Sequence, residues 1–171
     1  EATNDLVYQI GALQAFTKSK KLQHVKPHGA MYNQAVNDEV LARAIGEAVR
    51  EVDPDMVLVA LAGSAWITIA EDMGLTVARE IFADRALNAD GTLVSRSQPG
   101  SVIHDIEEVV SRSLKMVKEG TATAITGEEI EVEADSLCLH GDTPGAVEMA
   151  RALRHELERA DVEVVPVKRM L

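Results

Sequence analysis

Short apolar segments alternate with amphipathic helical segments along most of this chain. The predicted strands lie at residues 22–25, 56–61, 75–82 and 137–139. The predicted helices lie at residues 4–19, 38–52, 65–73, 105–118 and 144–160. The segment 56–61 is apolar throughout, which is typical of a parallel strand that is covered on both faces. This alternation predicts an α/β fold with a parallel sheet and helices outside it.

Four strands are too few to close a barrel, which typically takes about eight. Either the sheet is open or the chain lacks its opening βα units. The chain also begins with Glu1 rather than methionine, so we expect a single domain that is part of a longer protein. A small hairpin is expected within residues 123–132, and a short final strand at residues 162–165.

The composition argues against two classes of binding partner, nucleic acids and membranes. The formal net charge is −11 and aromatic residues make up 3% of the chain, so neither a basic footprint nor a stacking platform for nucleic acid is expected. No apolar run approaches the ~20 residues that span a bilayer, so we expect no membrane partner and a cytoplasmic protein. The single cysteine, Cys138, lies in a predicted strand and is expected to be buried and inert.

One strand tip carries an imidazole and a carboxylate. His140-Gly141-Asp142 follows the strand predicted at 137–139, Thr143 is expected as a helix N-cap, and Pro144 as the first helical residue. The carboxyl ends of parallel strands are where ligands bind in such folds. His140 and Asp142 are therefore candidates for proton transfer or metal binding, with a turn-capping role as the alternative.

A second tip repeats this design after the strand at 22–25. Lys26 precedes a proline, and His28 is followed by glycine, which tolerates a positive φ and a close approach of ligand. Two equivalent tips favour a shared pocket over two separate turn-capping histidines. Lys26 is a candidate cation for an anionic substrate, with a solvated lysine as the alternative.

Further candidates follow the strand at 75–82. Asp84 and Arg85 stand directly after it, and Arg96 lies in the polar loop at 92–100. A guanidinium matches a carboxylate or phosphate, so both arginines could hold an anion. The alternative for Asp84 and Arg85 is a solvent-exposed ion pair. The sequence has no Gly-x-x-x-x-Gly-Lys-Ser/Thr loop, no Gly-x-Gly-x-x-Gly and no His-Glu-x-x-His.

Six blocks of the sequence resemble the LamB/YcsF family, whose members are the A subunits of bacterial 5-oxoprolinase. The blocks are residues 8–13, 23–30, 82–86, 90–96, 98–100 and 140–146. They occur in the family's order and cover essentially the whole chain. Met31 and Leu87 stand where the family usually has leucine and tyrosine, and the segment 17–21 is a residue or two short.

This resemblance implies a seven-stranded (β/α) barrel of the glycoside hydrolase/deacetylase type. It implies ATP-dependent opening of the 5-oxoproline lactam to L-glutamate, with partner subunits B and C. ATP would bind on this chain or on a partner, and a divalent metal stays open as a second cofactor. The sequence lacks three motifs of the family: Asn-Cys-Asp-Leu-Gly-Glu, Cys-Gly-Phe-His-Ala-Gly-Asp and Ala-His-Pro-Gly. We therefore expect this chain to be the C-terminal two thirds of a longer one, with residues 1–171 forming part of one barrel.

The roles of individual residues in this reaction are hypotheses, and they are based on the placement of these residues at strand tips. The catalytic candidates are His28, Asp84, His140 and Asp142. The candidates for binding the substrate carboxylate are Lys26, Arg85 and Arg96. Two alternatives stay open: a metal-dependent deacetylase acting on acylated carbohydrate, and a non-catalytic substrate-binding subunit.

Overall fold

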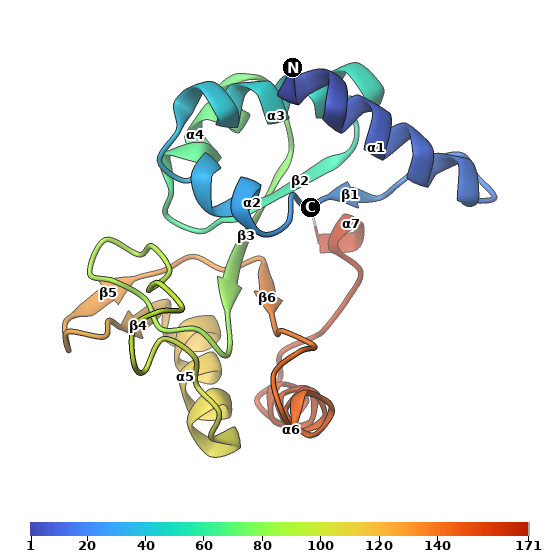
Figure 1. Cartoon of the computed structure of the whole chain (residues 1–171). Helices are drawn as coiled ribbons and strands as arrows, with labels where there is room; N and C mark the ends of the chain where they lie inside the picture. The colour runs from blue at the N-terminus through green and yellow to red at the C-terminus, as the bar shows by residue number, and fades with distance from the viewer. Residues whose placement is uncertain (171) are drawn as a thin grey trace. The chain divides into compact units, whose positions relative to one another are not determined.

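The computed structural model describes residues 1–170, which form two compact units. The first comprises Glu1–Arg79 together with the C-terminal residues from Val167 on, and the second comprises Glu80–Pro166. Each unit has its own helices, strands and buried residues, and each is described by itself (Figure 1).

The first unit is built on two parallel strands and the helices that follow them. Its elements are α1 (Ala2–Phe16), β1 (His24–Val25), α2 (Ala30–Ala35), α3 (Glu39–Val52), β2 (Val57–Leu61), α4 (Ala65–Asp72), the first half of β3 (Val77–Phe82) and α7 (Val167–Met170). β1 pairs with β2 in parallel, with His24 opposite Val57. Every residue of β2 is buried, as its continuous apolar run predicts.

The second unit contains the end of β3 and the elements that follow it. These are α5 (Ile106–Glu119), β4 (Thr121–Thr123), β5 (Glu129–Glu131), β6 (Ser136–Cys138) and α6 (Ala146–Arg159). β6 pairs with β3 in parallel, with Cys138 opposite Phe82, and β4 and β5 form the expected antiparallel hairpin. A core of buried side chains joins α5, α6 and the loop after β3: Ala83, Ile103, Val109, Met149 and Leu153.

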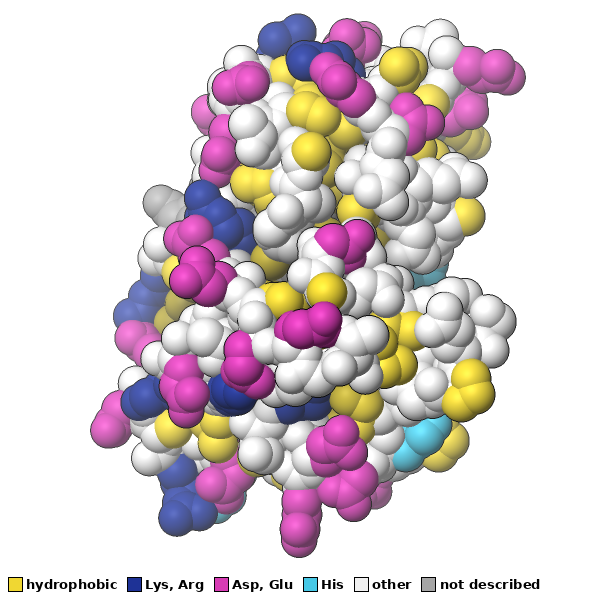
Figure 2. Space-filling view, turned by 90° about the vertical axis from the view of Figure 1, so that its left-hand side faces the viewer, with side chains coloured by type: hydrophobic (Ala, Val, Ile, Leu, Met, Phe, Trp, Pro, Cys, Tyr) yellow, Lys and Arg dark blue, Asp and Glu magenta, His cyan; other side chains and the backbone are white. Residues whose placement is uncertain are grey.

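The main sheet has the strand order β1-β2-β3-β6. Apart from the inserted hairpin, each strand lies beside the one that precedes it in the chain. The α/β class with parallel pairs and interspersed helices is therefore confirmed. On the face shown in Figure 2, acidic side chains are spread widely among the hydrophobic and polar ones, in keeping with the net charge of −11. None of the helices in residues 1–170 is long and apolar enough to cross a membrane.

Several sequence expectations are wrong in detail. The short helix α2 was not expected; it begins after Gly29, whose φ of +65° is readily adopted by glycine. Residues 162–166 form no strand. Thr143 is not the N-cap of α6, because that helix begins at Ala146 after Gly145 in a left-handed conformation. Cys138 is half-buried rather than fully buried.

The start of α5 provides a test of local helix energetics. Asp105 is the predicted N-cap, and its carboxylate accepts a hydrogen bond of 2.8 Å from the backbone N–H of Glu108. Asp105→Ala removes this acceptor, so we expect the free energy of unfolding to fall by about 1 kcal/mol. Urea denaturation measures the change. Asp105→Asn keeps an acceptor and should lie close to the wild type; equal losses in the two variants would contradict the capping role.

Candidate active site

A buried carboxylate, Asp84, is the centre of the site. It lies two residues after the end of β3 and is fully buried, with no exposed surface. Its backbone carbonyl accepts a hydrogen bond from the N–H of Ile103, which fixes the loop at this point. A buried carboxylate is costly unless its oxygens accept hydrogen bonds.

His140 supplies two of those hydrogen bonds. Its Nδ1 lies 2.9 Å from Oδ1 of Asp84, and its backbone N–H donates to Oδ2 at 3.3 Å. The two residues meet because β3 and β6 are paired with Phe82 opposite Cys138, and each residue lies two positions further along its chain. Because the carboxylate oxygen is the acceptor in this bond, Nδ1 is the donor and carries a proton.

Two neighbours fix the geometry of this pair. The imidazole of His140 stacks on the ring of Phe82, with centroids 5.6 Å apart and an interplanar angle of 20°. The hydroxyl of Thr143 donates to Oδ2 of Asp84 at 2.9 Å. This bond gives Thr143 a role at the site instead of the predicted helix cap. The arrangement holds one tautomer of an imidazole that is 18% exposed.

Two guanidinium groups lie within electrostatic reach of Asp84. Arg85 is buried and donates to the carbonyls of Ser101 at 3.2 Å and Val94 at 2.5 Å. The expectation of a solvent-exposed ion pair between Asp84 and Arg85 is wrong, because both side chains are buried. Arg112 of α5 was not among the sequence candidates. Burial lowers the pKa of both arginines, while the charge of Asp84 acts in the opposite direction.

Asp142 and Arg96 form a separate, exposed ion pair. Nη1 of Arg96 lies 3.5 Å from Oδ2 of Asp142, and their side chains are 53% and 72% exposed. Asp142 therefore lies with Arg96, outside the network of hydrogen bonds around Asp84. Exposed pairs of this kind are weak and exchange partners readily. The predicted roles of both residues stay predictions.

The candidates of the first tip lie in the other unit. His28 is exposed, and Nζ of Lys26 lies 5.6 Å from the ring centroid of Tyr32. Tyr32 in turn packs edge-on against Trp66, which is fully buried, with centroids 5.4 Å apart. The shared pocket of His28 and His140 stays a prediction.

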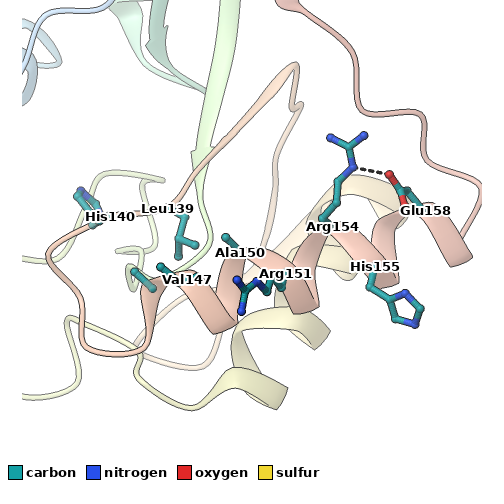
Figure 3. A pocket seen from close by; sticks show the side chains of 10 residues that line it. Leu139, His140, Val147, Ala150, Arg151, Arg154, His155 and Glu158 are labelled. Carbon is teal, nitrogen blue, oxygen red and sulfur yellow. Dashed lines mark hydrogen bonds and ion pairs between the residues drawn. The ribbon is translucent and has the colours of Figure 1, made fainter.

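An open groove begins at His140. It has a volume of about 690 Å³ and runs from Leu139, His140 and Gly141 along one face of α6 (Figure 3). The helix contributes small apolar and basic side chains: Ala146, Val147, Ala150, Arg151, Arg154 and His155. Arg154 is paired with Glu158 on the same helix. His140 therefore lies at the end of this groove, and its imidazole points away from α6 in Figure 3.

A resident metal or ATP would need a suitable set of donors at this site. Within residues 1–170, no group of three or more His, Cys, Asp or Glu side chains is placed to hold a metal ion. Both oxygens of Asp84 already accept hydrogen bonds from His140 and Thr143. The sequence also has no P-loop for the phosphates of ATP. The described residues alone therefore provide no metal-binding cluster, and the sequence lacks one class of ATP-binding loop.

The fold and the site define a parallel α/β protein with a buried Asp–His pair at neighbouring strand tips. Residues 1–171 match the model of the LamB/YcsF family, so the chain belongs to this family, and the resemblance is confirmed. A relative from Thermococcus onnurineus, named as the A subunit of 5-oxoprolinase, is 55% identical over 98% of this chain and 66% of its own length. A relative of the same name from Pyrococcus horikoshii is 51% identical over 100% of this chain and 68% of its own length.

A solved structure agrees with these relatives. The crystal structure of a lactam utilization protein from Thermus thermophilus matches 96% of this chain and 66% of its own, with a TM-score of 0.88 and 49% identity. The present chain thus spans about two thirds of the length of the curated relatives it matches.

The hydroxyl of Thr143 provides a direct test of the site. Thr143→Val leaves the buried carboxylate of Asp84 without one of its donors, so we expect a loss of about 1–3 kcal/mol in the free energy of unfolding. Thr143→Ser keeps the hydroxyl and should recover most of that loss. Urea denaturation of the two variants checks this; a Val variant as stable as the wild type would remove Thr143 from the site.

Proposed function

We propose that this chain carries the reacting centre of a 5-oxoprolinase, as the A component that hydrolyses 5-oxoproline to L-glutamate together with subunits B and C in an ATP-dependent reaction. Family membership and the names of the relatives support the class of reaction. The observation that carries the assignment to this site is the hydrogen bond from His140 to the fully buried Asp84.

In this proposal His140 acts as the general base. Nε2 takes a proton from water as the water oxygen forms a bond to the lactam carbonyl carbon. The C–N bond then breaks, and the imidazolium returns the proton to the leaving nitrogen, so lactam and water become the open amino acid. Asp84 holds the ring in the required tautomer and stabilises its charged form.

The carboxylate of the substrate needs a cation. Arg96 is the candidate that the geometry favours, because its partner Asp142 is exposed and 3.5 Å away, so a substrate carboxylate can replace it. Two donors of Arg85 are already engaged by backbone carbonyls, which favours a structural role for that side chain. Lys26 and His28 are kept as proposed contributors from the first unit.

ATP would supply the free energy for opening an unstrained amide by transferring its terminal phosphoryl group to the lactam carbonyl oxygen, which would leave ADP; the phosphate would be released when water opens the ring. We propose that ATP binds on this chain or on a partner subunit. We also propose that the parallel strands belong to a seven-stranded (β/α) barrel of the glycoside hydrolase/deacetylase type. The sequential order β1-β2-β3-β6 supports this, since doubly wound sheets reverse their strand order. A cytoplasmic location is part of the same proposal.

The function is tested by the release of glutamate from 5-oxoproline and ATP. The full-length subunit with partners B and C should lose about 100-fold or more in kcat on His140→Ala, because the general base is removed. His104→Ala is the matched control, since His104 is an exposed histidine in the same unit.

The control should keep wild-type turnover. Both variants are checked for folding by circular dichroism. Unchanged glutamate release in a folded His140→Ala variant would contradict the proposed base. A wild-type complex that releases no glutamate would contradict the reaction itself.

A further inference from the structure

Arg112, which is distant from Asp84 in the sequence, holds the end of β3, the strand that leads into Asp84. Nη1 of Arg112, on α5, donates to the carbonyl of Phe82 at 2.8 Å and to that of Ala83 at 2.7 Å. These are the two residues directly before Asp84. Phe82 also supports the ring of His140 by stacking. One guanidinium group thus fixes the backbone that leads into Asp84 and that carries the Phe82 ring on which the imidazole stacks.

Arg112 also places positive charge near Asp84. Burial lowers the pKa of this guanidinium, so holding it here is costly, and the charges of Glu108 and Asp84 partly offset that cost. The attraction is mutual, so the cation offsets part of the cost of burying the carboxylate of Asp84, which has no exposed surface. A carboxylate oxygen accepts the hydrogen bond from His140, which places a proton on Nδ1.

Other charged or titratable groups surround the pair. Arg85 is the second cation near Asp84, but its donors hold the carbonyls of Ser101 and Val94. Cys138 lies on β6 within electrostatic reach of Arg85. Glu108 is one turn before Arg112 on α5, and Arg96 and Asp142 form their exposed pair. Of the two cations, Arg112 alone bonds the carbonyls on the chain that leads into Asp84.

We propose that Arg112 is a positioning residue for the Asp84–His140 pair, acting through the carbonyls of Phe82 and Ala83 and through its charge. Its predicted effect on turnover rests on the proposed function. Its effect on the tautomer of His140 does not, because that tautomer is a property of the free protein. An experiment can therefore contradict the proposed function without contradicting the positioning role of Arg112, and the reverse.

The test reads the ring nitrogens of His140 by ¹⁵N NMR in full-length protein, at a pH where the imidazole is neutral. The wild type should show the proton on Nδ1. Arg112→Met removes both hydrogen bonds and the charge, and Arg112→Gln keeps a donor without the charge. Both should lose at least half of the Nδ1–H population. Arg112→Lys keeps the charge and a donor and should recover most of it.

The matched control is Lys118→Met, which removes a positive charge from the exposed end of the same helix. It should leave the tautomer unchanged. In the assembled enzyme, Arg112→Gln should lower kcat by roughly 10- to 100-fold, since small displacements of reacting groups have effects of this size, and Arg112→Lys should recover most of it. Wild-type tautomer populations in folded Arg112→Met and Arg112→Gln variants would overturn the proposal. An Arg112→Lys variant that loses as much of the Nδ1–H population as Arg112→Met would also overturn it.

Discussion

The burial of the Asp84 carboxylate is the constraint on which the rest of the site depends. A charge with no exposed surface has to be compensated by donors and cations that are already in place. The donors come from His140 and Thr143, and the positive charge comes from Arg85 and Arg112. Strand register brings His140 to Asp84, and α5 brings Arg112 to the end of β3. The second unit is therefore organised around one acidic side chain.

This arrangement also supports the proposed role of His140 in proton transfer. Its Nδ1 is bound to the carboxylate of Asp84, its ring stacks on Phe82, and the residue lies at the end of an open groove. A histidine that only capped a turn would need none of these contacts. In the proposed mechanism, the buried partner orients the imidazole through the hydrogen bond to Nδ1.

Local sequence patterns predicted most of the elements but not how the site is held together. The apolar run at 56–61 and the cap at Asp105 are local signals, and the structure confirms β2 and the start of α5. Asp84 and His140 could be named because each follows a strand. Their contact depends on the register between β3 and β6, which lie 56 residues apart in the chain at this point, and no local pattern encodes it.

The roles of Thr143 and Arg112 could not be predicted from the sequence for the same reason, because both depend on tertiary contacts. Thr143 has the pattern of an N-cap, but a buried carboxylate outcompetes the helix end for its hydroxyl. Arg112 lies in the middle of an amphipathic helix, where an arginine ordinarily points to solvent, and only the packing of α5 shows which carbonyls it reaches. In each case a tertiary contact replaced the local preference.

The central claim is that Asp84 and His140 act as one catalytic unit. The most direct measurement is a double-mutant cycle on kcat for glutamate release, using Asp84→Asn, His140→Ala and the double variant in the full-length complex. Residues that act together give effects that do not add. The account predicts that each single variant loses most of the activity and that the double variant is little worse than His140→Ala. Losses that add, or an Asp84→Asn enzyme with wild-type turnover, would contradict it.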